Sequence, residues 1–279
     1  MRVAYLGPAG TFSEEAALRR PDADPVPYPT VPDAIAAVAQ GDVDVAIVPI
    51  ENTLEGSIGT TLDTLATRDD VAVSGELVLP IAVHLVARTP IVPEEIERVL
   101  SHPQPLAQCA GYLRTQLPHA QLVPTSSTAE AVRVVMAASL ERWAALAPRR
   151  AAELYGARII AHDVADDAAN ATRFVWVSRT DGHEPPPDVP LRTSLTFWGE
   201  GDLAPGWLVR CLSEFAFRGV NLSKIESRPL RTGIGHYRFF VDCDGGAADP
   251  AVSQAIEGLR THCQEVRLLG SYPQARQVD

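Results

Sequence analysis

Short apolar runs alternate with segments of helical periodicity in the first part of the chain. Residues 1–6 and 44–50 are apolar runs of strand length, and the apolar positions of residues 30–40 recur at helical spacing as far as Gly41. Residues 71–88 form a longer β-rich stretch. This rhythm predicts an α/β fold in which helices cover a mostly parallel sheet.

The same pattern continues to residue 178. Strands are predicted near Val99 and Leu122 and over residues 158–162 and 173–178, and helices follow His102 and cover residues 128–138. We expect two α/β lobes, about 1–76 with 161–180 and about 77–160, separated by a cleft. Ligands of such folds bind where the loops at the carboxyl ends of the strands converge.

A proline-rich segment marks a change of pattern. Residues 180–190 (TDGHEPPPDVP) hold four prolines and lack periodicity, which is typical of a linker. Beyond it, strands at 193–198, 221–231, 235–242 and 264–269 and helices at 206–218 and 250–259 give the order βαββαβ, with a turn at 244–246. This order is the ferredoxin-like split motif. We therefore expect a first domain over residues 1–180, a linker at 181–190 and a second domain over 191–279.

Composition narrows the class of protein. The 279 residues are 46% hydrophobic and 21% charged, as in a globular protein with a core. A net charge of −11 without a basic stripe argues against a nucleic-acid binder. The four cysteines fall at no metal-ligand spacing, no signal-peptide pattern opens the chain, and the apolar runs are shorter than a membrane span. We expect a cytoplasmic protein without membrane contact.

Two polar loops follow predicted strands near the N-terminus. In the loop at residues 7–13 (GPAGTFS), glycines let backbone N–H groups approach an anion, and Thr11 offers a hydroxyl. The loop lacks the dinucleotide fingerprint and the P-loop lysine, so it does not indicate a nucleotide site. The loop at residues 49–57 offers Asn52 and Thr53 at the expected edge of the cleft. Tight turns and helix capping are the alternative interpretation of both loops.

Three later segments carry further candidates. Ser101 and His102 follow a predicted strand, and a turn or capping role is the favoured interpretation of His102. Ser127 with Thr128 begins a predicted helix, and capping is the favoured interpretation there unless the N-terminus of the helix faces the cleft. At residues 170–174 (NATRF), an arginine supplies the fork that holds a carboxylate, beside threonine and asparagine donors. No Ser-His-Asp order or zinc-binding pattern occurs, so the sequence favours neither a hydrolase nor a metalloenzyme.

Taken in order, these segments resemble the prephenate dehydratase family. The resemblance is carried by GPAGTFSEEAA from Gly7, VPIENTLEGSIG from Val48, SHPQPLAQC from Ser101, SSTAEAV from Ser126, AAELYGA from Ala151 and NATRF from Asn170. It covers nearly all of residues 1–179 and implies a two-lobed catalytic domain like that of periplasmic binding proteins. Residues 191–272 resemble an ACT domain, a ligand-sensing module, through 226–229 (ESRP) and 235–242 (GHYRFFVD). No chorismate mutase segment precedes Met1, which predicts a monofunctional chain.

The resemblance implies a reaction and its residues. The family converts prephenate to phenylpyruvate with loss of CO2 and water, and aromatisation drives the reaction without cofactor or metal. Thr172 is implied as the acid or hydrogen-bond donor to the leaving group, and Arg173 as the carboxylate clamp. Glu51 is implied to orient the residues that line the site. The implied substrate-binding residues are Thr11, Asn52, Thr53, Ser101, His102, Ser127, Thr128, Asn170 and Phe174.

The ACT resemblance implies feedback by an amino acid, phenylalanine in the first place, bound at an interface between subunits of a homodimer or homotetramer. The implied effector residues are Gly206, Trp207, Leu208, Asn221, Glu226, Ser227, Arg228 and Pro229. Where the family has Gly-Ala-Leu, this chain has Gly206-Trp207-Leu208. The indole of Trp207 either fills the effector pocket, changes its selectivity or points outward, so the identity and the sign of the effector stay open.

Three other functions remain open at this point. Arogenate dehydratase differs only in meeting an amino group where prephenate has a ketone, and the motifs do not separate the two substrates. A two-lobed small-molecule binding protein shares the cleft architecture, although the sensing module disfavours it. A catalytically inactive sensor is disfavoured by the intact Thr172-Arg173-Phe174.

Overall fold

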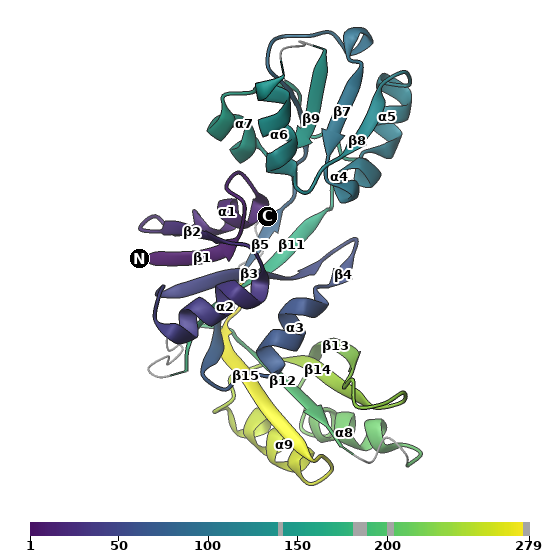
Figure 1. The fold of residues 1–279 in the computed structure, drawn as a ribbon. Coiled ribbons are helices and arrows are strands. Elements are labelled where there is room, and N and C mark those ends of the chain that lie inside the picture. Colours follow the sequence, from purple (N-terminus) through teal and green to yellow (C-terminus); the bar gives the residue numbers. More distant parts are fainter. Residues whose placement is uncertain (139–141, 181–188, 200–203, 276–279) are drawn as a thin grey trace. The chain divides into compact units, whose positions relative to one another are not determined.

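The computed structural model describes residues 1–138, 142–180, 189–199 and 204–275 (Figure 1). Residues 181–188 of the predicted linker lie outside this part of the chain. The residues group into two compact units. The first comprises Met1–Ala34, Asn52–Gly56 and Leu79–Thr172, and the second comprises Ile35–Glu51, Ser57–Val78 and Arg173–Asp279.

A parallel strand pair and a short helix open the first unit. Strands β1 (Arg2–Leu6) and β2 (Asp24–Tyr28) pair from Arg2–Asp24 to Leu6–Tyr28, and α1 (Phe12–Ala17) lies between them in the chain. The hydrophobic pattern predicts β1 but not β2, because two prolines interrupt the run DPVPY. Proline removes a donor from a strand and is tolerated at an edge, and β2 lies at the edge of its sheet.

A mixed five-stranded sheet forms the rest of the first unit. Its strands follow the order β10-β6-β9-β7-β8, with β7 parallel to β8 and β9, and with β6 antiparallel to β9 and β10. The strands are β6 (His84–Ala87), β7 (Arg98–Ser101), β8 (Gln121–Pro124), β9 (Trp143–Ala147) and β10 (Arg158–Ala161). The connections contain the 3₁₀ helix η1 (Pro93–Glu95) and the helices α4 (Pro103–Gln108), α5 (Ala110–Gln116), α6 (Thr128–Ala137) and α7 (Arg149–Tyr155).

Alternate side chains of this sheet enter two separate cores. Leu85 packs in one core with Leu113 of α5, while its neighbour Val86 packs in the other core with Val132 of α6. Successive side chains of a strand point to opposite faces, so helices from both sides cover a sheet that is buried on both faces.

The N-terminal half of the second unit contributes a short run of strands. Strands β3 (Val45–Asn52), β11 (Ala171–Arg179) and β5 (Val71–Pro80) are neighbours in this order, and the short β4 (Gly56–Ser57) pairs with β3. The connecting helices are α2 (Val31–Gln40) and α3 (Gly59–Ala66). Helix α2 ends at Gln40, just before Gly41, whose positive φ of 78° suits glycine, and this agrees with the predicted end.

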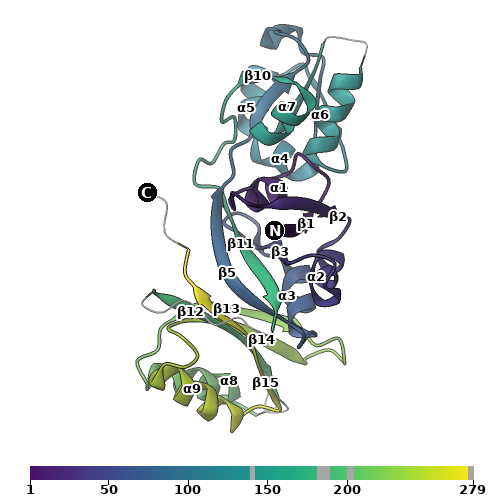
Figure 2. The ribbon, with the colours of Figure 1, turned by 90° about the vertical axis from the view of Figure 1, so that its left-hand side faces the viewer.

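The C-terminal part of the second unit is an antiparallel sheet with two helices. Its elements are β12 (Leu191–Trp198), α8 (Trp207–Ala216), β13 (Leu222–Pro229), β14 (Tyr237–Asp244), α9 (Pro250–Arg260) and β15 (Glu265–Pro273). The strand order is β13-β14-β12-β15, and Figure 2 shows α8 and α9 on the same face of the sheet. The predicted βαββαβ order and the mixed α/β class are confirmed.

Candidate active site and predicted effector segment

A cluster of neutral polar side chains surrounds Thr172 in the first unit. The amide Nδ2 of Asn52 donates to Thr172 Oγ1 at 3.0 Å, to Asn170 Oδ1 at 2.9 Å and to the carbonyl of Ala171 at 3.1 Å. Thr172, Asn52 and Asn170 are all buried. Among the described residues Thr172 Oγ1 accepts a hydrogen bond and donates none, so its proton is available to another acceptor.

Asn52 is fixed at its other end by its own loop. Its Oδ1 accepts from the backbone N–H groups of Leu54 and Glu55 at 2.9 and 3.1 Å. Thr53 adds a second tie, because its Oγ1 donates to the carbonyl of Ala169 at 3.3 Å and accepts from the N–H of Ala171 at 3.0 Å. The asparagine therefore caps a turn, as the structural alternative expected, and also holds the hydroxyl of Thr172.

Gln108 joins this cluster and was not among the predicted site residues. Asn170 Nδ2 donates to Gln108 Oε1 at 3.2 Å, which leaves Gln108 Nε2 buried without a partner among the described residues. A buried donor without a partner is costly unless a ligand or water satisfies it. The residue lies at the end of α4, within the segment SHPQPLAQC, but spacing alone gives no sign that it reaches Asn170.

The first polar loop is held against the start of two helices. A Cβ placed on Gly10 would lie 3.2 Å from Cβ of Ala129 and 3.3 Å from Cα of Ala151, so the backbone approaches α6 and α7 closely. The carboxylate of Glu14 accepts from the N–H of Gly10 at 2.7 Å and pairs with Arg150 at 3.1 Å. Gly10 also has a positive φ of 86°, which makes glycine the residue suited to this position.

The hydroxyls predicted along the cleft make local hydrogen bonds. Thr11 caps α1 and donates to the carbonyl of Pro8 at 3.0 Å. Ser127 caps α6 by accepting from the N–H of Glu130 at 3.0 Å, and Thr128 follows it, buried. Ser101 Oγ donates to a strand carbonyl at 2.7 Å, and His102 Nδ1 accepts from the backbone of its own helix at 3.3 Å.

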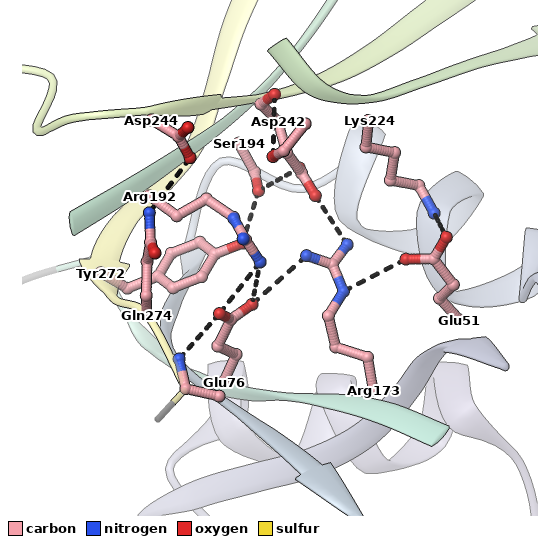
Figure 3. A network of polar contacts seen from close by, with 12 residues as sticks. Glu51, Glu76, Arg173, Arg192, Ser194, Lys224, Asp242, Asp244, Tyr272 and Gln274 are labelled. Carbon is pink, nitrogen blue, oxygen red and sulfur yellow. Dashed lines mark hydrogen bonds and ion pairs between the residues drawn. The ribbon is translucent and has the colours of Figure 1, made fainter. Parts of the chain in front are cut away.

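Arg173, the neighbour of Thr172 on β11, lies among three carboxylates of the second unit (Figure 3). Its Nη2 is 2.6 Å from Asp242 Oδ2, and its Nη1 and Nε are each 3.3 Å from Glu76 and Glu51 respectively. The arginine side chain is 11% exposed. Burial lowers the pKa of Arg173, but Asp242, Tyr272 and Glu76 outweigh burial and hold the pKa above its usual value. The predicted role as a substrate clamp stays a prediction.

The carboxylates around Arg173 have further partners from the C-terminal sheet. Glu76 pairs with Arg192 at 2.7 Å, Asp242 accepts from the hydroxyl of Ser194 at 2.5 Å, and Glu51 pairs with Lys224 at 3.2 Å (Figure 3). Ser194 also shares a hydrogen bond of 2.6 Å with the buried hydroxyl of Tyr272. We call Glu51, Glu76, Asp242, Arg173, Arg192 and Lys224 the Arg173 network; its three carboxylates and three cations balance. Phe174, which follows Arg173, lies in the core at 2% exposure.

A small pocket adjoins the predicted effector segment. Its volume is about 170 Å³ and its lining combines apolar side chains with charged ones: Asp63, Ala66, Thr67, Arg228, Pro229, Leu230, Arg231, Arg238 and Phe240. Arg228 forms a two-point contact with Asp63, at 2.6 and 2.9 Å, and this contact lowers the pKa of Asp63. Glu226 accepts from Ser57 Oγ at 3.2 Å.

Trp207 belongs to the interior of the C-terminal sheet and helices. It is 4% exposed, its ring lies 5.8 Å from that of Phe239, and its Nε1 donates to the carbonyl of His262 at 2.7 Å. The outward orientation is therefore wrong, and Trp207 is absent from the lining of the pocket beside Arg228.

The other predicted effector residues are dispersed. Gly206 caps α8 with a positive φ of 79°, and Leu208 packs against the core. Asn221 Nδ2 donates to Asp244 at 2.8 Å, while Ser227 and Pro229 pair with β14.

The part of the chain that the structure describes contains neither a metal-binding cluster nor a membrane-spanning helix. No cluster of three or more His, Cys, Asp or Glu side chains there is arranged to hold a metal ion. None of the described helices combines the length and the apolar character that crossing a bilayer requires.

Comparison with known proteins identifies the family. The family model for prephenate dehydratase matches residues 3–182. A prephenate dehydratase of Mycobacteroides abscessus is 40% identical over 98% of this chain and 90% of its own length. The crystal structure of an Arthrobacter aurescens prephenate dehydratase in complex with L-Phe has a TM-score of 0.90 at 38% identity, with 99% and 90% of the two chains covered. A structure described as a novel type of quorum quenching acylase has a TM-score of 0.89 at 29% identity and covers 99% of both chains. The chain thus belongs to the prephenate dehydratase family.

Proposed function

We propose that this chain converts prephenate to phenylpyruvate and that the hydroxyl of Thr172 donates to the leaving hydroxide. The observation that carries the proposal is the hydrogen bond from Asn52 Nδ2 to Thr172 Oγ1 at 3.0 Å. That bond occupies a lone pair of the hydroxyl oxygen and directs its proton to another acceptor. It also polarises the O–H bond, which favours donation to an oxygen that gains negative charge.

The chemistry requires few groups from the protein. The bond between the ring and its carboxylate breaks to release CO2, and its electrons form the new double bond of the aromatic ring. The electrons of the ring C–O bond leave with hydroxide, which takes up a proton to become water. The balance is prephenate dianion plus one proton giving phenylpyruvate anion, CO2 and water. Thr172 is a weak acid, so its contribution rests on its position.

We propose that Asn170 and Gln108 extend the row of donors next to Thr172. Gln108 Oε1, Asn170 and Asn52 are linked by successive hydrogen bonds, which supports a fixed orientation of all three amides. The unpartnered Gln108 Nε2 is then free to donate to the substrate. The remaining candidates, proposed to line the site through their backbone or side chains, are Thr11, Thr53, Ser101, His102, Ser127 and Thr128, whereas Phe174 lies in the core.

The test is phenylpyruvate formation by the purified protein at neutral pH, with an enzyme-free control for spontaneous breakdown of prephenate. Turnover without added metal or cofactor supports the proposal. Arogenate is assayed in parallel, because it differs from prephenate only in carrying an amino group where prephenate has a ketone. A folded protein that turns over arogenate alone would reassign the substrate, and one inactive on both would overturn the proposal.

We propose that the C-terminal βαββαβ domain, residues 191–279, binds an amino-acid effector, with phenylalanine first. The support is the L-Phe complex of the Arthrobacter aurescens relative and the pocket beside Arg228, whose lining combines charged and apolar side chains. Arg231, 80% exposed and joined to Asp63 through Nη2 at 3.0 Å, has further donors that suit the carboxylate of an amino acid. The test is the rate of dehydration with and without L-phenylalanine, with L-alanine as the control ligand. An unchanged rate and no L-phenylalanine binding by calorimetry would contradict the effector assignment.

We propose a cytoplasmic homo-oligomer, a dimer or tetramer, with a catalytic domain over residues 1–180. Exposed apolar side chains on the C-terminal elements support self-association, since Phe217 is 86% and Ile225 50% exposed in the single chain. Light scattering gives the oligomer size, and a strict monomer at micromolar concentration would contradict this proposal.

A further inference from the structure

The Arg173 network contains the group assigned by resemblance to hold the substrate. Both terminal nitrogens of the guanidinium donate to protein carboxylates, Nη2 to Asp242 at 2.6 Å and Nη1 to Glu76 at 3.3 Å, while Nε lies 3.3 Å from Glu51 without a hydrogen bond among the described residues. An arginine that binds a carboxylate ligand presents two N–H groups side by side to it. In this arrangement a substrate anion would have to displace a protein carboxylate and would meet the other two, which carry the same charge as the substrate.

The two strongest partners of Arg173 are held firmly. Glu76 is 2% exposed and accepts from Arg192 at 2.7 Å and from the N–H of Ala275 at 2.8 Å. Asp242 is 7% exposed and accepts from Ser194. Both carboxylates are thereby held by residues of the C-terminal sheet or of the segment that follows β15. The contact therefore fixes Arg173 to elements that do not belong to the cluster around Thr172.

Strand geometry links Arg173 to Thr172. The two residues are consecutive on β11, and consecutive side chains of a strand point to opposite faces. A side chain locked on one face fixes the backbone that carries the side chain on the other face. A shift of the Arg173 backbone therefore changes the 3.0 Å distance between Thr172 Oγ1 and the amide of Asn52.

We infer that Arg173 is a positioning residue that fixes the reactive hydroxyl of Thr172 by anchoring β11 to Asp242 and Glu76, and that it does not contact the substrate. This inference rests on the proposed role of Thr172. It predicts a loss of catalytic rate without a loss of substrate affinity when the anchor is broken from either side. It also predicts that the effects of replacing Arg173 and of replacing its carboxylate partner are not additive.

The experiment is a double-mutant cycle of Arg173→Gln and Asp242→Asn, with kcat and KM for prephenate measured for each variant. Arg173→Gln is expected to lower kcat at least tenfold and to leave KM within about threefold of its original value. Asp242→Asn should act in the same direction, and the double variant should be no worse than Arg173→Gln alone, because interacting residues are not additive. Arg173→Lys should retain part of the rate.

Arg142→Gln is the matched control, because Arg142 forms an exposed ion pair with Glu97 and should alter neither constant. A KM raised thirtyfold or more by Arg173→Gln, with Asp242→Asn unchanged, identifies a substrate clamp and overturns the inference. Additive losses in the double variant overturn it too. If Arg173→Gln does not fold, Arg173→Lys and Asp242→Asn decide by the same split between kcat and KM. Absence of turnover by the unmodified protein would instead refute the proposed function.

Discussion

Replacing Thr172 by valine removes the hydroxyl proposed to act on the leaving group and keeps nearly the same side-chain volume. Asn52 Nδ2 loses one acceptor but retains Asn170 Oδ1 at 2.9 Å and the carbonyl of Ala171 at 3.1 Å. The free energy of unfolding should therefore fall by only about 1 kcal/mol, the usual net value of one hydrogen bond. The loss of a preorganised donor to a developing negative charge costs about 10²–10³-fold in kcat, or ~2.7–4 kcal/mol in activation free energy.

The assay follows phenylpyruvate from prephenate at pH 7, with urea unfolding of each variant as the control for folding. Thr172→Ser keeps a hydroxyl and should retain a measurable part of the rate. Asn52→Leu should lower kcat because it removes the donor that directs the Thr172 hydroxyl. Near-normal kcat for a folded Thr172→Val would refute the role of the hydroxyl. A raised KM with unchanged kcat would show that Thr172 only binds substrate.

Three other regions give predictions that need only purified variants. Burial lowers the pKa of His84, whose Nδ1 accepts from the N–H of Asp163 at 3.1 Å. The stabilising effect of neutral His84 is complete above the unfolded pKa of about 6.5 and is lost as the pH falls towards the lower folded pKa, so His84→Gln should flatten the decline of the urea midpoint between pH 7 and 5. Trp207→Ala should lower the stability of the C-terminal domain by about 3–5 kcal/mol, and Trp207→Phe by less, as urea unfolding will measure. Mild peroxide should cross-link Cys211 and Cys263, whose sulfurs lie 3.8 Å apart, before it oxidises Cys109 and Cys243. Burial raises the thiol pKa of each of these two cysteines to about 12. Peptide mapping checks the order of oxidation.

Hydrophobic periodicity predicts most of the fold because most elements have one regular pattern of burial. The βαββαβ order follows from alternation in strands such as β13, whose side chains alternate between partly buried and exposed. Strand β9 was missed because WAALA is buried on both faces and its alanines show no alternation. Helices α5 and α7, of seven residues each, were missed as well, because so short a helix shows barely two turns of its period.

The sequence predicts which polar residues belong to the candidate site, but it does not predict which of them contact one another. Asn52 and Thr172 were both selected for their polar groups at strand ends, yet 120 positions separate them in the chain and no local pattern pairs them. Gln108 was missed because its contribution depends on reaching Asn170 across the fold. Likewise, the charge of Arg173 predicts a carboxylate partner but not whether that carboxylate belongs to the substrate or to the protein.

Thr172 and Arg173 point to opposite faces of β11, and the partners of Thr172 are neutral whereas those of Arg173 are charged. Around Thr172 the partners are amides and backbone carbonyls, which carry no net charge and do not repel a dianion. The Arg173 network holds as many cations as carboxylates, so it adds no net charge either, in a chain with a net charge of −11. Replacing Arg173 by a neutral residue therefore leaves the network one negative charge in excess. Screening that excess with raised salt should leave the defect in kcat unchanged, because that defect comes from misplacing Thr172.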